Sequence, residues 1–104
     1  MQRGDIWWGE LPPPVGRRPL LLLSRDSAYR IRTSVTVAVI TRTIRSIPSE
    51  VQLTEQDGMP VQCAVNLDNI ITIPKSRLTE RITKLSAAKM TDVTKAITFA
   101  LDLR

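Results

Sequence analysis

The fold is decided by the stretch Arg17-Arg18-Pro19-Leu20-Leu21-Leu22-Leu23-Ser24-Arg25-Asp26, in which a basic pair passes through a proline into four leucines. Proline fixes φ at about −65° and disfavours helix in the residue before it, so Arg18 is predicted to be extended or in a turn. The leucine block is too short for a helix and is bounded by turn signals, which indicates a strand buried on both faces. We therefore expect a permanent cation at the mouth of a buried strand.

Length and charge limit the range of functions. The 104 residues (11.7 kDa) are expected to form one domain, which is small enough that pairing with a second copy would help to stabilise it. The formal charge of +5 and the pI near 10.1 predict a polyanionic partner, because a basic groove attracts phosphate-bearing ligands. The same field attracts acidic proteins.

The residue inventory excludes several chemistries. The chain has no histidine, which excludes zinc hydrolases, Ser-His-Asp triads and ribonuclease mechanisms that use a histidine pair. The single cysteine, Cys63, permits no internal disulfide and falls on the apolar side of an alternating run, so a buried, inert thiol is expected. No apolar run approaches the ~18 residues of a membrane span, and we expect a cytoplasmic protein.

Hydrophobic patterning predicts a mainly β domain with a C-terminal helix. The run Ser34–Thr43 is dense in β-branched residues and is expected to be the central strand. The Asp57-Gly58 pair predicts a hairpin, and Asp68-Asn69 is expected to end a strand. About seven short, mostly antiparallel strands are predicted in a small bent barrel: Gly4–Leu11, Leu20–Ser24, Ser34–Thr43, Glu50–Leu53, Val61–Leu67, Ile70–Ile73 and Arg81–Leu85.

Only the tail is predicted to be helical. Ser86 is a good N-cap, and apolar residues then recur at intervals of three and four as far as Leu101. A helix over Ser86–Leu103 would span roughly 27 Å, enough to lie across the sheet.

Aromatic and basic side chains supply candidate ligand contacts. Trp7 and Trp8 are expected on opposite faces of the first strand, with one ring in the core and the other at an interface. The alternative is that one of them is exposed and stacks on a nucleobase. The segment Arg25–Thr33 carries three arginines, which indicate either a solvated face or a rim that tracks phosphates, with Tyr29 available for stacking. Thr41, Arg42, Thr43 and Arg45 mark the polar end of the central strand, although threonine is also common in ordinary strands.

Several blocks together resemble a family, the MazF/PemK toxins, which are bacterial endoribonucleases of toxin–antitoxin pairs. The likeness covers nearly the whole chain in order, as a single toxin domain over residues 1–104. The blocks are Arg3-Gly4-Asp5-Ile6-Trp7, Arg18–Asp26, Val37–Thr41, Pro48-Ser49-Glu50-Val51, Asp68–Ile73 and Arg77-Leu78. The resemblance implies an SH3-like barrel that forms a homodimer and cuts single-stranded messenger RNA at short sequences without a metal or other cofactor.

The resemblance also implies site residues. The arginine of the Arg-Pro block and the threonine that ends the third long strand carry catalysis in the family, and they match Arg18 and Thr41. Attack by the RNA 2′-hydroxyl, which leaves 2′,3′-cyclic phosphate and 5′-hydroxyl ends, passes through a phosphorane with added negative charge. A fixed guanidinium suits that charge, and a hydroxyl can donate a further hydrogen bond. The expected RNA-binding residues are Arg17, Arg25, Tyr29, Arg42, Arg45 and Asp68.

The chain departs from the family pattern before the Arg-Pro block. It carries Pro12–Gly16 and Arg17 in place of a longer loop with an acidic residue. Glu10 and Asp68 are the remaining candidates for the group that accepts the 2′-hydroxyl proton.

Partners and alternatives follow from the same resemblance. An acidic, partly disordered antitoxin similar to MazE is expected to fold into the basic groove. One alternative is a poison of DNA gyrase on the same barrel, similar to CcdB, but such members rely on a C-terminal Trp-Gly-Ile, and this chain ends Leu101-Asp102-Leu103-Arg104. The other alternative is an RNA-binding barrel without catalysis.

Overall fold

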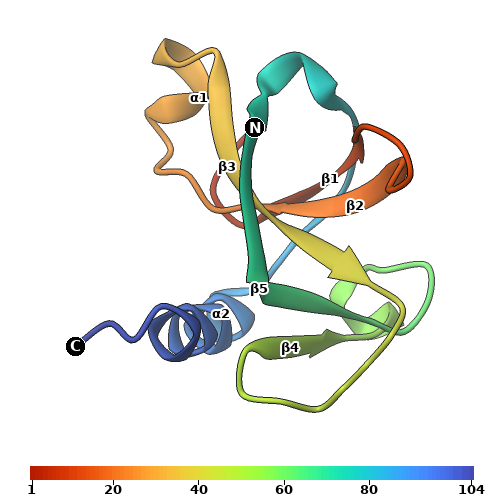
Figure 1. Cartoon of the computed structure of the whole chain (residues 1–104), viewed down its shortest axis with the longest axis vertical. Coiled ribbons are helices and arrows are strands. Elements are labelled where there is room, and N and C mark those ends of the chain that lie inside the picture. Colours follow the sequence, from red (N-terminus) through yellow and green to blue (C-terminus); the bar gives the residue numbers. More distant parts are fainter.

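The computed structural model describes residues 1–104, which fold into one strongly curled antiparallel sheet (Figure 1). The spatial order of the strands is β4-β5-β3-β2-β1-β6. The strands are β1 (Asp5–Glu10), β2 (Arg17–Leu22), β3 (Ser34–Thr41), β4 (Glu50–Leu53), β5 (Cys63–Pro74) and β6 (Leu78–Lys84). The helices are α1 (Ala28–Ile31) and α2 (Ala87–Ala100), with 3-10 turns η1 (Glu55–Asp57) and η2 (Lys75–Arg77).

The predicted small barrel with a C-terminal helix is confirmed, with six strands instead of about seven. The difference lies at Asp68-Asn69, which does not end a strand. Ala38 pairs with Ile70 while Val39 pairs with Asn66, so the residues between Asn66 and Ile70 form a bulge inside β5. The two predicted strands are therefore one long strand, which bends at the bulge and pairs with both β3 and β4.

Apolar side chains fill both faces of the central strands. The expectation for the leucine block is confirmed, since Leu20, Leu21 and Leu22 are fully buried. Ile6, Leu21, Ala38 and Ile40 belong to a cluster that packs under α2, whereas Leu20, Leu22, Val37 and Val39 belong to a cluster on the opposite face. This two-sided burial fixes the register of β2 against β3.

The turn between β4 and β5 closes the barrel against the other edge strand. The predicted Asp57-Gly58 turn and its hairpin are confirmed, and Gly58 adopts a left-handed φ of 93°. The Thr83 hydroxyl on β6 donates to the Asp57 carbonyl (3.3 Å), and a Cβ on Gly58 would lie 2.3 Å from that hydroxyl. A glycine is thus required both by the backbone and by the close approach of β6.

Helix α2 begins as predicted and ends earlier. The Ser86 hydroxyl accepts from the Lys89 amide (3.1 Å), and Val93 and Ala96 are buried. The predicted position of Leu101 on the apolar stripe is wrong, because the helix ends at Ala100 and Leu101 is 55% exposed. The helix packs on β4 and β5 at one end of the sheet rather than across all of it. Neither helix has the length and apolar character needed to cross a membrane.

Candidate active site

Arg18 and Thr41 lie on neighbouring strands, β2 and β3. The ladder between these strands pairs Leu22 with Val37, Leu21 with Ala38 and Leu20 with Val39. Continuing this register by two residues on each strand brings Arg18 opposite Thr41. The ladder stops before them because Pro19 has no amide hydrogen to donate. Pro19 therefore ends the pairing between β2 and β3 and leaves Arg18 and Thr41 beyond the ladder.

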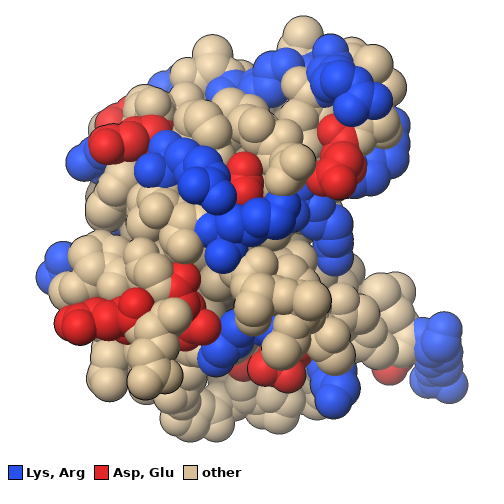
Figure 2. All heavy atoms as spheres, turned by 180° about the vertical axis from the view of Figure 1, so that it is seen from behind, with Lys and Arg blue, Asp and Glu red and all other residues tan.

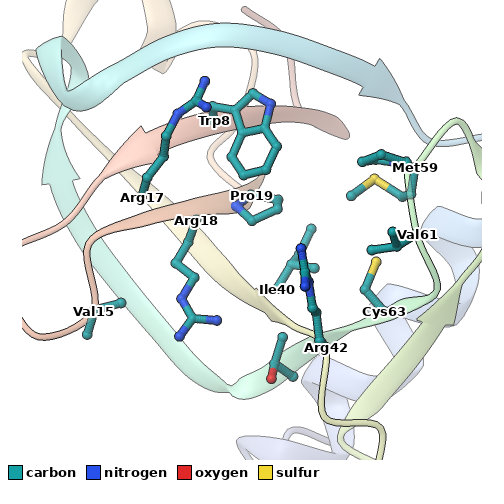
Figure 3. A pocket seen from close by; sticks show the side chains of 12 residues that line it. Trp8, Val15, Arg17, Arg18, Pro19, Ile40, Arg42, Met59, Val61 and Cys63 are labelled. Carbon is teal, nitrogen blue, oxygen red and sulfur yellow. The ribbon is translucent and has the colours of Figure 1, made fainter.

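Both residues line one groove with a volume of about 610 Å³ (Figure 3). Its walls come from the β1–β2 hairpin, the end of β3 and the segment that leads into β5. The lining residues are Trp8, Val15, Arg17, Arg18, Pro19, Ile40, Thr41, Arg42, Met59, Pro60, Val61 and Cys63. The groove thus combines apolar walls with three guanidinium groups and no carboxylate.

The two arginines of the basic pair have different surroundings. Arg17 forms ion pairs with Glu10 (3.7 Å) and Glu80 (3.6 Å), and its guanidinium lies 4.4 Å from the centre of the Trp8 ring. Arg18 has no ion-pair or hydrogen-bond partner, and its side chain extends from β2 into the groove (Figure 3). Within the basic pair, the free cation is therefore Arg18, whereas the charge of Arg17 is balanced.

The Trp8 ring forms part of the groove wall beside Arg17 (Figure 3). Trp7 packs instead against the apolar cluster on the opposite face, so the expectation that the two rings face opposite sides is confirmed. Arg17 and its two acidic partners are exposed, which lowers the worth of each ion pair, but they hold the guanidinium over the indole. Trp8 therefore presents an oriented aromatic surface next to Arg18.

The Thr41 hydroxyl is oriented by its own strand end. Its oxygen accepts a hydrogen bond from the Thr43 amide (3.1 Å). A hydroxyl has one donor proton and two acceptor sites, so this contact leaves the O–H free to donate into the groove. Thr43, which was predicted to lie in the same strand, falls beyond its end at Thr41.

The two arginines that follow Thr41 have different places. Arg42 is exposed, lines the groove and has no acidic partner. Arg45 is held by Glu50, whose carboxylate accepts from the Arg45 amide (2.8 Å) and lies 3.3 Å from its guanidinium. The Glu50 side chain is only 1% exposed, so Arg45 is fixed at the start of β4, outside the groove.

Tyr29 does not offer a ring for stacking. It is buried on α1, and its hydroxyl donates to the Ser24 carbonyl (3.1 Å). Burial raises the pKa of Tyr29 to about 12. The segment predicted as a polar loop contains a short helix because Ala28 and Tyr29 turn into the core. Arg25 is exposed but follows the opposite end of β2 from Arg18 and does not line the groove.

The two carboxylates considered as proton acceptors both lie outside the groove. Glu10 pairs with Arg17, and Asp68 accepts from the buried Ser49 hydroxyl (2.5 Å) at the β5 bulge. The only other titratable group in the groove is the Cys63 thiol, whose pKa is raised by burial and by the nearby Asp57 carboxylate. The thiol is buried as expected and stays neutral at physiological pH.

Sequence reasoning missed the wall that Met59, Pro60 and Val61 contribute from the β4–β5 connection. No local signal identifies these residues, because the β4–β5 hairpin is distant from Arg18 in sequence and comes to line the same groove only in the folded chain. The structure brings together no group of three or more histidine, cysteine, aspartate or glutamate side chains that could hold a metal ion.

Comparison with known proteins gives consistent matches. Residues 2–101 match the family described as "PemK-like, MazF-like toxin of type II toxin-antitoxin system". The chain is 41% identical over 91 residues to the probable endoribonuclease MazF2 of Mycobacterium tuberculosis, covering 86% of this chain and 87% of that protein. It is 32% identical over 111 residues to endoribonuclease EndoA of Bacillus subtilis, covering 99% and 96% of the two chains.

A solved structure agrees with these sequence matches. A mycobacterial endoribonuclease in complex with its cognate antitoxin superposes with a TM-score of 0.90 at 29% identity, covering 100% of this chain and 97% of that one. The structural agreement therefore extends over the whole chain.

Proposed function

Given that the chain belongs to the PemK-like, MazF-like toxin family of type II toxin–antitoxin systems and is one of its endoribonucleases, we propose that it cleaves single-stranded messenger RNA at a phosphate held between Arg18 and Thr41. The observation that carries this proposal is the groove in which an unpaired guanidinium and an outward-donating hydroxyl meet at the open end of two strands. We place the reaction in the bacterial cytoplasm.

The proposed reaction is an attack by the 2′-hydroxyl on its own 3′-phosphate. A bond forms between the 2′-oxygen and phosphorus, and the bond from phosphorus to the 5′-oxygen breaks. The products carry a 2′,3′-cyclic phosphate and a 5′-hydroxyl. Arg18 neutralises the charge that develops on the non-bridging oxygens, and the Thr41 hydroxyl donates to one of them.

Proton transfer in this reaction is assigned to the solvent. The groove holds three guanidinium groups and a neutral thiol, none of which accepts a proton near neutral pH. The 2′-hydroxyl therefore loses its proton to water or hydroxide, and the leaving 5′-oxygen takes one from water. Catalysis by this chain then rests on charge stabilisation and alignment rather than on a side-chain base.

Incubation with a long transcript in excess chelator tests the assignment. The wild-type protein is expected to cut the transcript, and Arg18→Ala is expected to abolish cutting. Arg104→Ala, which removes an exposed arginine at the C-terminus, is the matched control and should cut normally. Equal cutting by the wild type and Arg18→Ala would overturn the role of Arg18, and sequencing the new ends would check the predicted termini.

The Trp8 ring and its arginine give the groove a platform for a base. We assign the half-buried Trp8 ring, which lines the groove, to stack on a nucleobase next to the scissile phosphate, since every base has an aromatic face. Arg17 is then a positioning residue rather than a phosphate ligand, because Glu10 and Glu80 already balance its charge. Arg42 remains the second phosphate contact at the groove.

The cognate antitoxin is proposed to compete for this groove. A solved relative is described in complex with its cognate antitoxin. An acidic, disordered segment of such a partner would pair with the free guanidinium groups of Arg18 and Arg42 and pack on the apolar groove walls. Addition of the antitoxin should therefore protect RNA and weaken RNA binding, and simultaneous binding of both would contradict a shared groove.

A homodimer is also proposed, with a specific face for the second copy. A separate groove of about 490 Å³ runs between the β1–β2 loop and β5, lined largely by apolar side chains that include Leu11, Val39, Ile71 and Ile73. A surface of this kind is typical of an interface. Sedimentation of the wild type and Ile71→Asp would test it: the wild type should sediment as a dimer and the variant as a folded monomer.

No structural observation favours the gyrase-poison alternative. Intact RNA after prolonged incubation with the wild-type protein would instead favour the non-catalytic barrel.

A further inference from the structure

A polar pocket lies at the opposite end of β2 from the catalytic groove. It has a volume of about 460 Å³. Its walls come from the α1 segment, the start of β3 and the last part of β5. Two arginines line it, Arg25 and Arg32, together with five hydroxyl side chains: Ser24, Thr33, Ser34, Thr36 and Thr72. We call this the distal pocket. None of its lining residues is acidic.

The arginines of the distal pocket are free to bind an anion. Neither Arg25 nor Arg32 forms an ion pair, and both are exposed. Arg30 on α1 is a third exposed arginine in the same segment, although it does not line the pocket. The nearest carboxylate in sequence, Asp26, accepts from the Arg3 amide (2.7 Å) and does not line the pocket. Figure 2 shows Lys and Arg side chains gathered at the end of the molecule at which α1 lies.

The hydroxyls of the distal pocket are pre-arranged. The Ser24 hydroxyl accepts from the Thr36 amide (2.8 Å), which leaves its own proton available. The Thr36 and Thr72 hydroxyls share one hydrogen bond (3.0 Å), so one of their two protons remains free to donate outward. Guanidinium and hydroxyl donors are the set that proteins use to contact nucleic-acid phosphates.

The position of the distal pocket fits a continuous polyanion. Arg18 and Ser24 lie six residues apart along β2 and its extension, a distance of roughly 20 Å at about 3.3 Å per residue. A nucleic-acid strand seated in the groove carries phosphates on both sides of the cleaved linkage. We propose that the distal pocket binds a backbone phosphate of the same RNA strand, several nucleotides away from the cut, and so selects long over short substrates.

This inference rests on the proposed ribonuclease function, and its test separates the two. Binding is measured in an Arg18→Ala background, which prevents cleavage, with a short RNA of roughly 6 nucleotides and a long one of roughly 20, both centred on the mapped cleavage site. The test variant is Arg25→Gln/Arg32→Gln. The matched control is Lys95→Gln/Arg104→Gln, which removes two exposed cations from α2 and the C-terminus.

The test variant is expected to bind the long RNA about tenfold more weakly and to bind the short RNA unchanged. Its plot of log affinity against log salt should be shallower by about 0.7 for the long RNA only, because one lost phosphate contact on a single strand contributes about 0.7. With Arg18 restored, it should cut the short RNA at the wild-type rate. Loss of cutting in the wild type would count against the ribonuclease function, not against the pocket.

Three results would overturn the proposal. One is unchanged affinity of the test variant for the long RNA, and another is an equal loss for both lengths. The third is weaker binding of an acidic antitoxin peptide by the test variant with RNA binding intact, which would make the distal pocket a protein-binding surface. The control pair should behave as wild type in every arm.

Discussion

Arg18 and Thr41 occupy facing positions on β2 and β3, two residues past the last ladder pair of Leu20 with Val39. The last ladder pair holds the two backbones about 5 Å apart, and from facing positions just beyond it a long and a short side chain can reach a single phosphate. The six residues of this ladder are all buried, so the two strands are firmly packed directly behind the site. The chemistry of the groove follows from this fixed pair.

Replacement of Thr41 is expected to slow the chemical step. Thr41→Ala removes the donated hydrogen bond and should lower kcat by about 10²-fold, while the Kd for RNA changes little because the hydroxyl acts mainly on the transition state. Thr41→Ser keeps the donor and should retain most of the activity. Single-turnover cleavage and RNA binding check both; a purely weaker Kd in Thr41→Ala would remove the residue from catalysis.

Replacement of Trp8 is expected to remove a base contact. Affinity is measured for a series of RNAs, each of which lacks the base at one position. The wild-type protein should lose about 10-fold or more in affinity at one of these positions, since stacking contributes about 1–3 kcal/mol per base. In Trp8→Ala that position should no longer matter, and in Trp8→Phe it should matter less. Persistence of the full abasic penalty in Trp8→Ala would rule out stacking on this ring.

The pH dependence of cleavage should lack the signature of a side-chain base. The arginines of the groove stay charged, and the raised pKa of Cys63 keeps its thiol neutral. The single-turnover rate should therefore rise about tenfold per pH unit between about pH 5 and pH 8, as expected when hydroxide takes the proton. A plateau within that range would reveal a base that the monomer does not place in the groove, such as one from a second copy.

Tyr29 is expected to stabilise the fold only below alkaline pH. Its folded pKa of about 12 exceeds the unfolded value of 10.0, so its contribution is complete below about pH 10 and is lost as pH rises toward 12. The loss amounts to roughly 2 to 3 kcal/mol of unfolding free energy, at about 1.4 kcal/mol per pKa unit.

Tyr29 is the only tyrosine, so tyrosinate absorbance titrates this group directly. Tyr29→Phe should be less stable than wild type at neutral pH through the lost hydrogen bond to Ser24, yet its stability should fall less steeply between about pH 10 and 12. A normal titration midpoint near 10 in the folded protein would contradict the burial of this side chain.

The sequence predicts what depends on local chemistry. The leucine block, the central β3, the Asp57-Gly58 hairpin and the Ser86 cap are each encoded within a few residues, and all are found in the structure. The prediction that Arg18 and Thr41 act together came from the family resemblance. The β2–β3 register explains how two residues so far apart in sequence lie opposite each other.

The errors arise where tertiary structure decides. Asp68-Asn69 is a turn signal, but long-range pairing with β3 carries the chain through it as a bulge. Tyr29 reads as an exposed stacking ring because its segment is rich in arginine, but the helix α1 turns it into the core. The resemblance distinguishes Arg18 from Arg17 only by its position before Pro19. The charge balance of Arg17 depends in part on Glu80, a residue more than sixty positions away.

A double-mutant cycle on Arg18 and Thr41 tests the central claim most directly. Single-turnover cleavage of one RNA is measured for wild type, Arg18→Lys, Thr41→Ala and the double variant. Because both groups contact the same phosphate, the double variant should be faster than the product of the two single losses predicts, by about 3-fold or more. Losses that simply multiply would show that the two residues act independently and would contradict a shared phosphate.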